Sequence, residues 1–470
     1  MPEDIIIKTF KTYKHPYAYD RHTDTLIMLS EDEYSELARV EKGELSCGQS
    51  QAVRKYQEQG LFAPNIVEKI EHYGSVIIEQ YMNTRMKQLI LQVTQQCNLR
   101  CGYCTYSGGY DKQRTHTSRR MQYETAVKAI DFFLDRNNEL PEVVIGFYGG
   151  EPLLEFGLIK RCVDYAKSRA EGKKIKFNMT TNGTLLTEDV ADYLIENEFT
   201  IAISLDGSEA EHDANRRFAN GEGSFSTIIE NVRGMLKRHP EYARSITFMT
   251  TINPNIELDC VMEYFSTEEL FSDKNIIFNS VNEVYHKGDL CYDEDYYGIR
   301  NFEYIKMLFS MVGKLDSMYV SPLVSRAKSS IERKQKSITM RQDISSMMHH
   351  GGPCMPGVMR FFVRVDGALF PCERVSEELD FFKIGTLEDG LDIDKMRRLL
   401  NIGKLTENEC KKCWGLRHCM LCASQIEFDG SLSRGDKIKE CPGCLSSDMD
   451  ELHELCVLNE FGLGAERLRV

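Results

Sequence analysis

The residues best suited to chemistry in this sequence are its cysteines, of which there are 16 among 470 residues. Where thiols stay reduced, clustered cysteines are more often metal ligands than disulfides. Five cysteines are scattered and are typical of small buried apolar residues. The other eleven form two groups, Cys97, Cys101 and Cys104, and then Cys354, Cys372, Cys410, Cys413, Cys419, Cys422, Cys441 and Cys444. We therefore expect two metal-binding regions.

The first group has the pattern Cys-x3-Cys-x2-Cys and directly follows the apolar segment QLILQVT. Three thiolates this close in sequence can hold one [4Fe–4S] cluster and leave its fourth iron without a protein ligand. That iron is then open to a substrate or cofactor. Structural zinc is the alternative, but closed zinc sites take four ligands, usually from paired Cys-x2-Cys motifs. The spacing favours the cluster.

Alternating strands and helices must position these thiols. Six apolar, β-branched segments predict strands, and they are QLILQVT, VVIGFY, KIKFNMT, TIAISL, SITFMTTI and NIIFNSV. Amphipathic stretches between them predict helices near residues 121–138, 155–170, 187–197, 224–238 and 257–271. Strands separated by helices build a parallel sheet. Six strands are too few for a closed eight-stranded barrel, so we expect a partial, open barrel.

Polar or Gly-rich motifs follow successive predicted strands, at the barrel edge where functional residues gather. They are Cys97–Cys104, Gly149-Gly150-Glu151-Pro152, Thr180-Thr181-Asn182-Gly183 and Ser204-Leu205-Asp206-Gly207. Alone, GGEP or TTNG is typical of a turn. Together, at four successive strand ends, the motifs resemble those of the radical S-adenosylmethionine (SAM) superfamily over roughly residues 88–285.

The resemblance implies a SAM-binding cluster on the first three cysteines. It also implies that the GGE motif contacts the SAM amino group and that Asn182, Ser204 and Asp206 meet the ribose and carboxylate. Arg216 would pair with the carboxylate, whose two oxygens match a guanidinium fork. The candidate SAM-binding residues are Tyr103, Gly149, Gly150, Glu151, Asn182, Ser204, Asp206 and Arg216. The sequence identifies no catalytic acid, base or nucleophile.

The C-terminal cysteines include two Cys-x2-Cys pairs, which alone would favour structural zinc. Their order resembles the SPASM extension of radical SAM enzymes, which holds two auxiliary [4Fe–4S] clusters. The resemblance assigns the following ligands: Cys354, Cys372 and Cys422 to the cluster nearer the barrel, and Cys410, Cys413, Cys419 and Cys441 to the distal one. Cys419 and Cys422 have two residues between them instead of the three in the SPASM pattern, and Cys444 is extra. If Cys444 is not a ligand, the nearer cluster keeps an open iron for a peptide thiolate.

Residues 1–85 predict a small module ahead of the barrel. Its first part predicts two or three short strands, and Ser30 with Glu33 predicts a capped helix through residues 31–43. A second helix is expected from Ser50 to Gln59. The order suggests a winged-helix-like module and resembles the peptide-recognition element of enzymes that process ribosomally made peptides. Such elements bind a leader peptide as an added strand. A purely structural module is the alternative.

The predicted fold class is α/β, a partial (β/α)6 TIM-like radical SAM barrel. A winged-helix-like α+β module precedes the barrel and a Cys-rich iron–sulfur domain follows it. We expect domains over residues 1–85, 86–285, 286–350 (a polar helical connector) and 351–470. The last segment has little periodicity, so metal is its expected organiser.

Charge and hydropathy exclude several other classes of protein. A net charge of −14 and a pI of about 5.4 argue against a nucleic-acid-binding protein, which needs a basic face. No apolar run approaches the ~18 residues of a membrane span. The N-terminus lacks the positive and apolar regions of a signal peptide, so a cytoplasmic location is expected.

The resemblance implies an oxidoreductase-type enzyme that modifies a ribosomally made, Cys-containing precursor peptide with a leader. Reductive cleavage of SAM would give a 5′-deoxyadenosyl radical that takes a hydrogen from a peptide carbon. A peptide cysteine would then bond to that carbon in a thioether, as in sactipeptide and ranthipeptide maturases. Three [4Fe–4S] clusters, SAM and a low-potential, flavodoxin- or ferredoxin-like electron donor are expected.

Two alternatives stay open. One is another peptide oxidation on the same scaffold, such as carbon–carbon crosslinking or formylglycine formation from Cys or Ser. The N-terminal module argues mildly against formylglycine formation, which depends on a short local motif. The other is a non-enzymatic zinc or iron–sulfur interaction protein.

Overall fold

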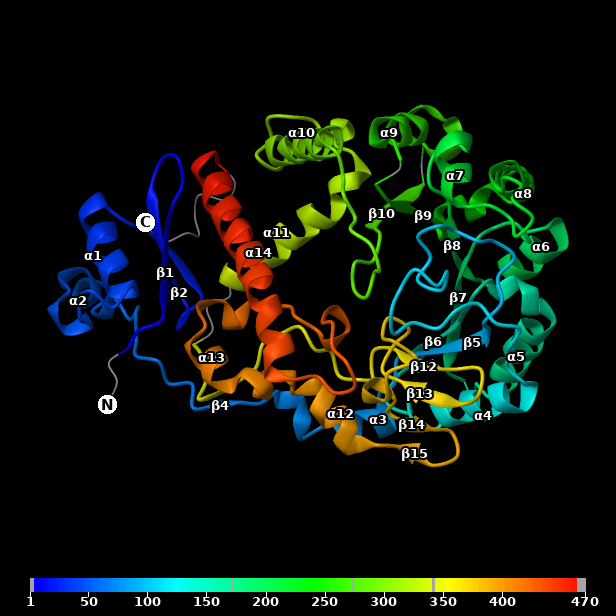
Figure 1. The fold of residues 1–470 in the computed structure, drawn as a ribbon, viewed down its shortest axis with the longest axis horizontal. Coiled ribbons are helices and arrows are strands. Elements are labelled where there is room, and N and C mark those ends of the chain that lie inside the picture. The colour runs from blue at the N-terminus through cyan, green and yellow to red at the C-terminus, as the bar shows by residue number, and fades with distance from the viewer. Residues whose placement is uncertain (1–3, 171, 255, 273, 340–342, 463–470) are drawn as a thin grey trace. The chain divides into compact units, whose positions relative to one another are not determined.

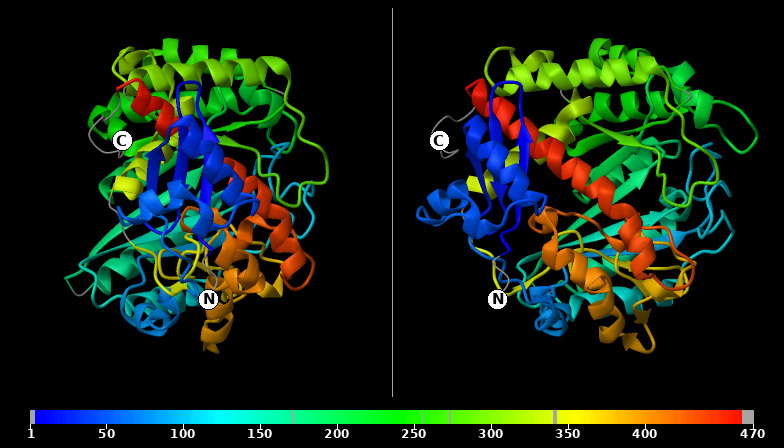
Figure 2. Two further views of the ribbon diagram at one scale, coloured as in Figure 1. Left: turned by 90° about the vertical axis from the view of Figure 1, so that its left-hand side faces the viewer. Right: turned by 60° about the vertical axis from the view of Figure 1, so that its left-hand side comes forward.

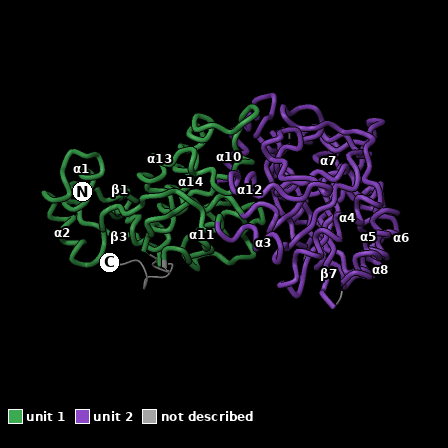
Figure 3. The backbone as a smooth tube through the Cα atoms, turned by 90° about the horizontal axis from the view of Figure 1, so that it is seen from below, with its two compact units in different colours: residues 1–75, 302–354, 400–470 green, residues 76–301, 355–399 purple. Residues whose placement is uncertain are grey.

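The computed structural model describes residues 4–170, 172–254, 256–272, 274–339 and 343–462. The chain divides into two units, each built from separate stretches of sequence (Figure 3). The first unit contains residues 1–75, 302–354 and 400–470, and the second contains residues 76–301 and 355–399. The cysteines of the first motif therefore lie in the second unit, and most of the C-terminal cysteines lie in the first.

A parallel sheet organises the second unit and confirms the predicted partial barrel. Its six parallel strands neighbour one another in chain order: β5 (Gln88–Thr94), β6 (Glu142–Gly149), β7 (Lys174–Thr181), β8 (Thr200–Ser204), β9 (Ile246–Ile252) and β10 (Asn275–Ser280). The intervening helices are α4 (Tyr123–Leu134), α5 (Phe156–Ser168), α6 (Glu188–Glu196), α7 (Glu209–Asn215), α8 (Phe225–Arg238) and α9 (Leu258–Thr267). Figure 1 shows these helices along the outer side of the strands. Only α7 was not expected from the sequence.

The core of this unit lies between the strands and their helices. Alternate residues of β6 are buried, and aromatic rings from successive strands stack there. The ring centroids of Phe147 and Phe177 are 6.4 Å apart, and those of Phe177 and Phe199 are 5.3 Å apart. Each buried aromatic side chain stabilises the fold by roughly 1.5–3 kcal/mol. The same alternation turns every other strand residue toward the inside of the barrel.

Part of the C-terminal sequence extends this sheet, which was not foreseen. Strand β12 (Phe361–Val363) pairs parallel to β5. Three short antiparallel strands follow: β13 (Ala368–Phe370), β14 (Gly385–Thr386) and β15 (Gly390–Leu391). The strand residues Phe361, Phe362 and Phe370 are buried. Apolar packing therefore organises residues 361–391, where metal alone was expected. Two further helices of the second unit are α3 (Ile78–Thr84) and α12 (Ile393–Leu400).

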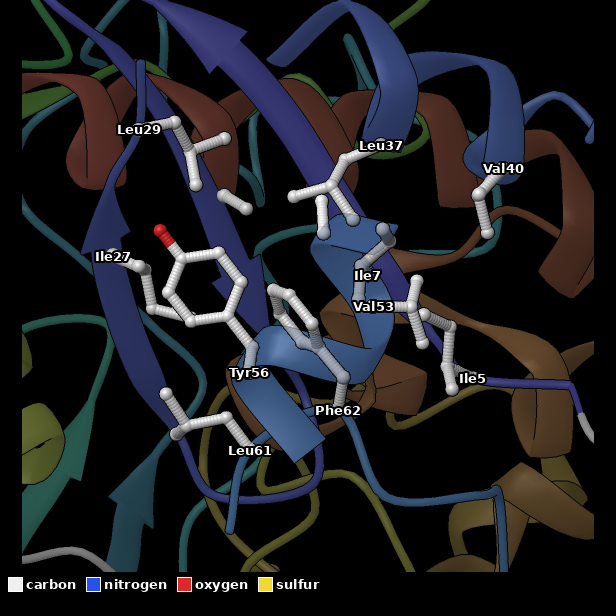
Figure 4. Packing of buried hydrophobic residues seen from close by; sticks show 12 residues of the cluster. Ile5, Ile7, Ile27, Leu29, Leu37, Val40, Val53, Tyr56, Leu61 and Phe62 are labelled. Atoms are coloured by element: carbon white, nitrogen blue, oxygen red, sulfur yellow. The ribbon is translucent and has the colours of Figure 1, made fainter. Parts of the chain in front are cut away.

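The first unit begins with an antiparallel three-stranded sheet, β1 (Ile7–Lys11), β2 (Pro16–Asp20) and β3 (Thr25–Met28). Helices α1 (Glu31–Glu41) and α2 (Gln51–Gln57) follow, and the predicted capping box of Ser30 and Glu33 opens α1. The apolar side chains between the sheet and these helices form a closed core (Figure 4). The predicted order of strands and helices is thus confirmed.

The other face of the N-terminal sheet packs on helices from distant sequence. They are α10 (Glu294–Met311), α11 (Ser325–Thr339) and α14 (Arg434–Glu460), of which α14 runs beside β1 and β2 (Figure 2). Short elements complete the unit: β4 (Lys69–Ile70) pairs with β11 (Met347–Met348), and α13 (Glu407–Lys412) carries the first distal cysteine. Among the described residues, no helix combines the length and the apolar character that a bilayer span requires.

Candidate functional site

A cavity of about 310 Å³ opens at the carboxyl ends of strands β5 to β10. A cavity of this size lies at the lower end of the range for small-molecule sites. The predicted SAM-site residues on its wall are Cys97, Cys101, Tyr103, Cys104, Gly149, Gly150, Glu151, Asn182, Ser204 and Arg216. The barrel topology explains the convergence, because the carboxyl ends of parallel strands meet at one edge.

The three thiols of the first motif stand together in this cavity. The backbone N–H of Leu99 donates to Cys97 Sγ at 3.4 Å, and that of Tyr106 donates to Cys104 Sγ at 3.4 Å. Burial raises the pKa of Cys97 to about 12, and the neighbouring thiols Cys101 and Cys104 add to the rise. Half-buried thiols that line one cavity, two of which accept from backbone N–H groups, are suited to holding a metal centre.

Arg216 is held by a buried carboxylate beside these thiols. Its Nε donates to Asp206 Oδ2 at 2.8 Å, and its Nη1 lies 3.9 Å from Cys101 Sγ. Asp206 also accepts from the Tyr103 hydroxyl and, at 2.9 Å, from the backbone N–H of Thr251. Burial alone would lower the pKa of Arg216, but the Asp206 carboxylate keeps that pKa well above its usual value. The guanidinium is therefore a fixed cation on the cavity wall.

Gly149 and Gly150 allow β6 to end against the cysteine loop. The backbone N–H of Gly150 donates to Thr94 O at 3.1 Å, and that of Glu151 donates to Gln96 O at 2.9 Å. A Cβ atom at Gly149, where φ is +150°, would collide with Thr94 O, and one at Gly150 would collide with Gln96 O. The two glycines are thus required by close backbone approach, which brings the GGE motif next to the thiols.

Comparison with known proteins agrees with this geometry. Residues 91–264 match the family model described as the radical SAM superfamily. The chain contains a radical SAM domain. The match begins in β5, ahead of the three cysteines, and ends in α9. It therefore includes every residue predicted to bind SAM.

Several relatives share more than the radical SAM domain. The chain is 35% identical over 197 residues to an uncharacterised protein of Methanocaldococcus jannaschii, and this match covers 41% of the chain and 62% of the relative. It is 26% identical over 319 residues to a cysteine-type anaerobic sulfatase-maturating enzyme of Clostridium novyi, covering 65% of the chain and 77% of the relative. The solved structure of native anSMEcpe with bound AdoMet is similar in fold, with a TM-score of 0.57 and 22% identity. The match covers 79% of this chain and 99% of the chain in that structure.

Glu151 connects the ends of two strands of the radical SAM domain through hydrogen bonds. Its carboxylate accepts from Thr181 Oγ1 at 2.7 Å and from the backbone N–H groups of Asn182 at 2.7 Å and Leu153 at 3.0 Å. Burial raises the pKa of Glu151, and these three hydrogen bonds oppose the rise. The carboxylate therefore joins the ends of β6 and β7. Its predicted contact with a SAM amino group stays a prediction.

Asn182 and Ser204 line the cavity at the ends of β7 and β8. Asn182 Nδ2 donates to Asn98 Oδ1 at 2.8 Å and lies 3.8 Å from Cys97 Sγ. Thr184 donates to Asn182 Oδ1 through both its backbone N–H and its hydroxyl. Asn182 thus ties the cysteine loop to the TTNG turn. Asp206 is not part of the cavity wall; it holds Arg216 and Tyr103, which are.

Several cavity residues of the radical SAM domain had no signal in the sequence. Tyr106, His116 and Tyr148 line the cavity together with Thr251 and Asn282. His116 Nε2 lies 3.9 Å from Cys104 Sγ, and Arg114 stacks over the Tyr106 ring, its Cζ 3.6 Å from the ring centroid. Single aromatic residues and a lone histidine in a loop carry no distinctive spacing. Only the fold brings them to the site.

The predicted distal ligands gather in the first unit. Burial raises the pKa of Cys413 to about 12, and the nearby thiols Cys410, Cys419 and Cys441 add to the rise. The extra thiol joins this group, since a hydrogen bond between Cys444 and Cys419 lowers the pKa of Cys444 and raises that of Cys419. Cys441 and Cys444 lie three residues apart on α14. Five thiols therefore meet where four were assigned.

The predicted ligands of the nearer cluster lie in both units. Cys354 and Cys422 belong to the first unit and Cys372 to the second. Cys354 is exposed, whereas Cys372 and Cys422 are half-buried. Their assignment to one cluster stays a prediction.

A zinc ion bound by cysteines requires closely spaced sulfur atoms. In a tetrahedral site with Zn–S bonds of about 2.3 Å, the sulfurs lie about 3.8 Å apart. Within the described part of the chain, the one set of three candidate ligand atoms within 4.8 Å of one another belongs to Glu257, Asp259 and Cys260, which are exposed or half-exposed. Among the described residues, no three of the predicted cysteine ligands lie this close to one another.

Proposed function

We propose that this protein is a radical SAM maturase that installs a thioether crosslink in a ribosomally made, Cys-containing precursor peptide. One observation carries the proposal: three half-buried thiols and the cation of Arg216 line the cavity of the radical SAM domain. A thiol triad suits a cluster with one open iron, and a guanidinium suits the carboxylate of an amino acid. SAM is a ligand with that amino acid tail.

The residues present fit both groups. Cys97, Cys101 and Cys104 would hold the cluster, and Arg216, fixed by Asp206, would receive the SAM carboxylate. When bound, a reduced [4Fe–4S] cluster and SAM supply methionine and a 5′-deoxyadenosyl radical, which takes a hydrogen atom from the peptide. The chain contributes orientation, because Arg216 and the GGE backbone fix the end of the ligand beside the thiols.

A peptide or protein substrate is supported by the relatives. The similarity to a cysteine-type sulfatase-maturating enzyme extends over 65% of this chain, well beyond the radical SAM domain. In a thioether product, one peptide C–H bond and one S–H bond are replaced by a C–S bond. The hydrogen atom leaves on 5′-deoxyadenosine, the thiol proton is released, and one electron must be accepted. The two C-terminal cysteine sets are where we place auxiliary [4Fe–4S] clusters for that electron.

The N-terminal sheet is our candidate for the leader-binding surface. Strands β1 and β3 are its edges, and the β1 edge is partly covered because Thr9 N–H donates to Glu41 of α1 at 2.8 Å. Strand β3 is therefore the better template for an added peptide strand. The N–H groups of β3 alternate, and because Leu29 donates to Pro16 of β2, the N–H of Met28 faces the open edge. A labelled leader peptide should bind the enzyme, and proline in place of Met28 should weaken that binding without loss of iron.

Formylglycine formation is the second candidate, and the sulfatase-maturating relatives favour it. Mass spectrometry separates the two products. A thioether removes two hydrogen atoms and keeps the sulfur, whereas formylglycine formation replaces the cysteine sulfur by oxygen.

The decisive experiment uses anaerobically purified full-length enzyme with SAM, dithionite and each short Cys-containing peptide that is found encoded near its gene. We expect charge-transfer absorption, 5′-deoxyadenosine and a product that has lost two hydrogen atoms. The matched control replaces Cys97, Cys101 and Cys104 by Ala, which should remove about one cluster of iron and all SAM cleavage. A colourless, zinc-containing protein would contradict the proposal. A product without sulfur would replace thioether formation by formylglycine formation.

A further inference from the structure

A lysine is buried against the distal cysteines in the first unit. Lys437 is 1% exposed although it carries an ammonium group. Its Nζ donates to Thr406 Oγ1 at 2.8 Å and lies 3.7 Å from Cys410 Sγ. Lysine is almost never fully buried unless its charge is paired. The position of Lys437 therefore needs a counter-charge.

Carboxylates do not supply that counter-charge at close range. Among the described residues, Lys437 Nζ has no carboxylate oxygen within 4.0 Å, and the nearby Glu409 pairs instead with Arg434. An uncompensated buried ammonium costs several kcal/mol. The groups beside Nζ are thiols, which carry negative charge only as thiolates. A centre with four thiolates would be anionic and would compensate the ammonium.

Thr406 connects the ammonium to the sulfur. The Thr406 side chain is fully buried, and its Oγ1 lies 3.2 Å from Cys410 Sγ. Because Lys437 donates to Oγ1, the hydroxyl hydrogen is free to point at the sulfur. A thiolate that binds a metal can only accept hydrogen bonds. Lys437 Nζ–H therefore donates to Thr406 Oγ1, and the Thr406 hydroxyl donates to Cys410 Sγ. Cys410 thus receives one hydrogen bond and a nearby positive charge.

We propose that Lys437, acting with Thr406, sets the redox potential of the distal auxiliary cluster and makes that cluster easier to reduce. Reduction adds negative charge, which a fixed ammonium and a hydrogen bond to a ligand sulfur both stabilise. Lys437 touches no substrate and is a positioning residue. The inference rests on the proposed function in one respect, that the distal thiols hold an iron–sulfur cluster. It does not depend on which peptide is modified.

The test is an EPR-monitored redox titration of reconstituted full-length enzyme without peptide. Cys413→Ser identifies the distal signal by its loss. Lys437→Met keeps the length of the side chain but removes the charge, and Thr406→Val removes only the hydroxyl. We expect Lys437→Met to lower the equilibrium constant for reduction of the distal cluster at least tenfold, which is 59 mV for a one-electron couple. Thr406→Val should lower the same equilibrium constant, by a smaller factor.

The control is Lys439→Met on the same helix, where the side chain is 75% exposed and the ammonium lies 3.9 Å from Asp436. This variant should leave the potential unchanged. Full iron content with an unshifted potential in both Lys437→Met and Thr406→Val would overturn the inference while leaving thioether formation intact. If Lys437→Met fails to take up iron, Thr406→Val alone decides. The two proposals can also fail independently. An unchanged potential in the variants would reject the role of Lys437, and a peptide left unmodified by the wild-type enzyme would reject thioether formation.

Discussion

The buried carboxylate of Asp206 accepts a hydrogen bond from Arg216 Nε at 2.8 Å, and together they form an ion pair on the wall of the radical SAM cavity. Asp206 is fully buried and 10 residues from Arg216 in sequence, across helix α7. The short helix returns the chain to the strand end and so presents the guanidinium to the thiols. The ion pair fixes the Arg216 guanidinium before a ligand binds. Binding therefore costs less conformational entropy.

Replacing Arg216 by Lys should weaken SAM binding by about 10- to 100-fold, since a charged hydrogen bond is worth about 1.5–3 kcal/mol. Lysine keeps the charge but cannot contact Asp206 and a carboxylate with one planar fork. Equilibrium dialysis with labelled SAM measures the effect. Arg217→Lys is the matched control, because Arg217 is exposed and its guanidinium donates to Gly221 O. Equal affinities in the two variants would exclude Arg216 as the carboxylate partner.

The sequence was sufficient for the first helix, for the barrel and for the gathering of the first cysteines with the strand-end motifs, because local signals agree at these places. Ser30 and Glu33 form the capping box that their spacing predicts, and six apolar segments become β5 to β10. Contacts between distant segments could not be predicted. Strand β12 has three residues, and only its pairing with β5 makes it a strand. Lys437 has no local signal either, since its role depends on Thr406 and Cys410 some 30 residues away.

Gly149→Ala and Gly150→Ala should each destabilise the radical SAM domain by more than about 2 kcal/mol, because an added Cβ forces the β6 end away from the cysteine loop. Iron content should fall with stability. Gly234→Ala is the control, since Gly234 lies in helix α8 and an added Cβ there meets no atom within 4 Å. That variant should gain up to about 1 kcal/mol from helix propensity. Thermal unfolding of the three variants gives the comparison, and a stable Gly150→Ala would contradict it.

Arg21 ties the N-terminal sheet to the distal cysteine segment within the first unit. Its Nη1 donates to the carbonyl oxygens of Lys411 at 2.8 Å and Cys413 at 3.1 Å, and its Nη2 contacts Asn65. Arg21→Met removes the guanidinium donor from both carbonyls, at about 1.5–3 kcal/mol for each charged hydrogen bond. Lys411 O still accepts from Asn65 Nδ2 at 3.1 Å, and Cys413 O still accepts from the backbone N–H of Leu416 at 3.4 Å. We expect a lower Tm and loss of distal iron. Deleting the module to test leader binding would therefore also damage the cluster region.

The control for Arg21 is Arg54→Met, because Arg54 is exposed on α2 and its guanidinium donates to the carbonyl of Gly48. It should keep full iron content. If Arg21→Met also keeps its iron and its Tm, the N-terminal sheet is independent of the cysteine segment and can be deleted cleanly.

Stability should depend on pH through His212. Burial, with a smaller effect of Arg216, lowers the pKa of His212 to about 4. The neutral ring fits its contacts, since Nδ1 accepts from Asp206 N–H and Nε2 lies 3.0 Å from Ser224 Oγ. The unfolded chain takes up a proton near pH 6.5 but the folded chain does not, so the free energy of unfolding falls as pH drops from about 6.5 to 4.

Thermal unfolding of the enzyme between pH 7 and 5 measures this loss, which His212 alone can bring to about 2 kcal/mol at pH 5. His212→Gln should flatten the pH dependence, whereas the exposed His15→Gln should not. An unchanged slope in His212→Gln would show that other groups cause the loss.

Cys444 is the thiol that decides whether the nearer cluster has an open iron. The structure places it against Cys419, a predicted distal ligand, and the distal set already contains Cys410, Cys413 and Cys441. A fifth thiol cannot add a ligand to a cluster that has four. We therefore expect Cys444→Ala to keep three clusters and to form the crosslink at a rate near that of the wild type.

If the assignment that the SPASM resemblance implies is right, three cysteines would remain for the nearer cluster. Its free iron would then bind the peptide thiolate, which metal binding deprotonates. A precursor with its Cys replaced by Ser should then still lose hydrogen to the 5′-deoxyadenosyl radical but give no crosslink. Iron analysis of Cys444→Ala checks the premise. Loss of about four irons per chain would make Cys444 a ligand. If the lost iron belonged to the nearer cluster, that cluster would be fully coordinated, and the peptide sulfur would have to attack the carbon radical without a metal.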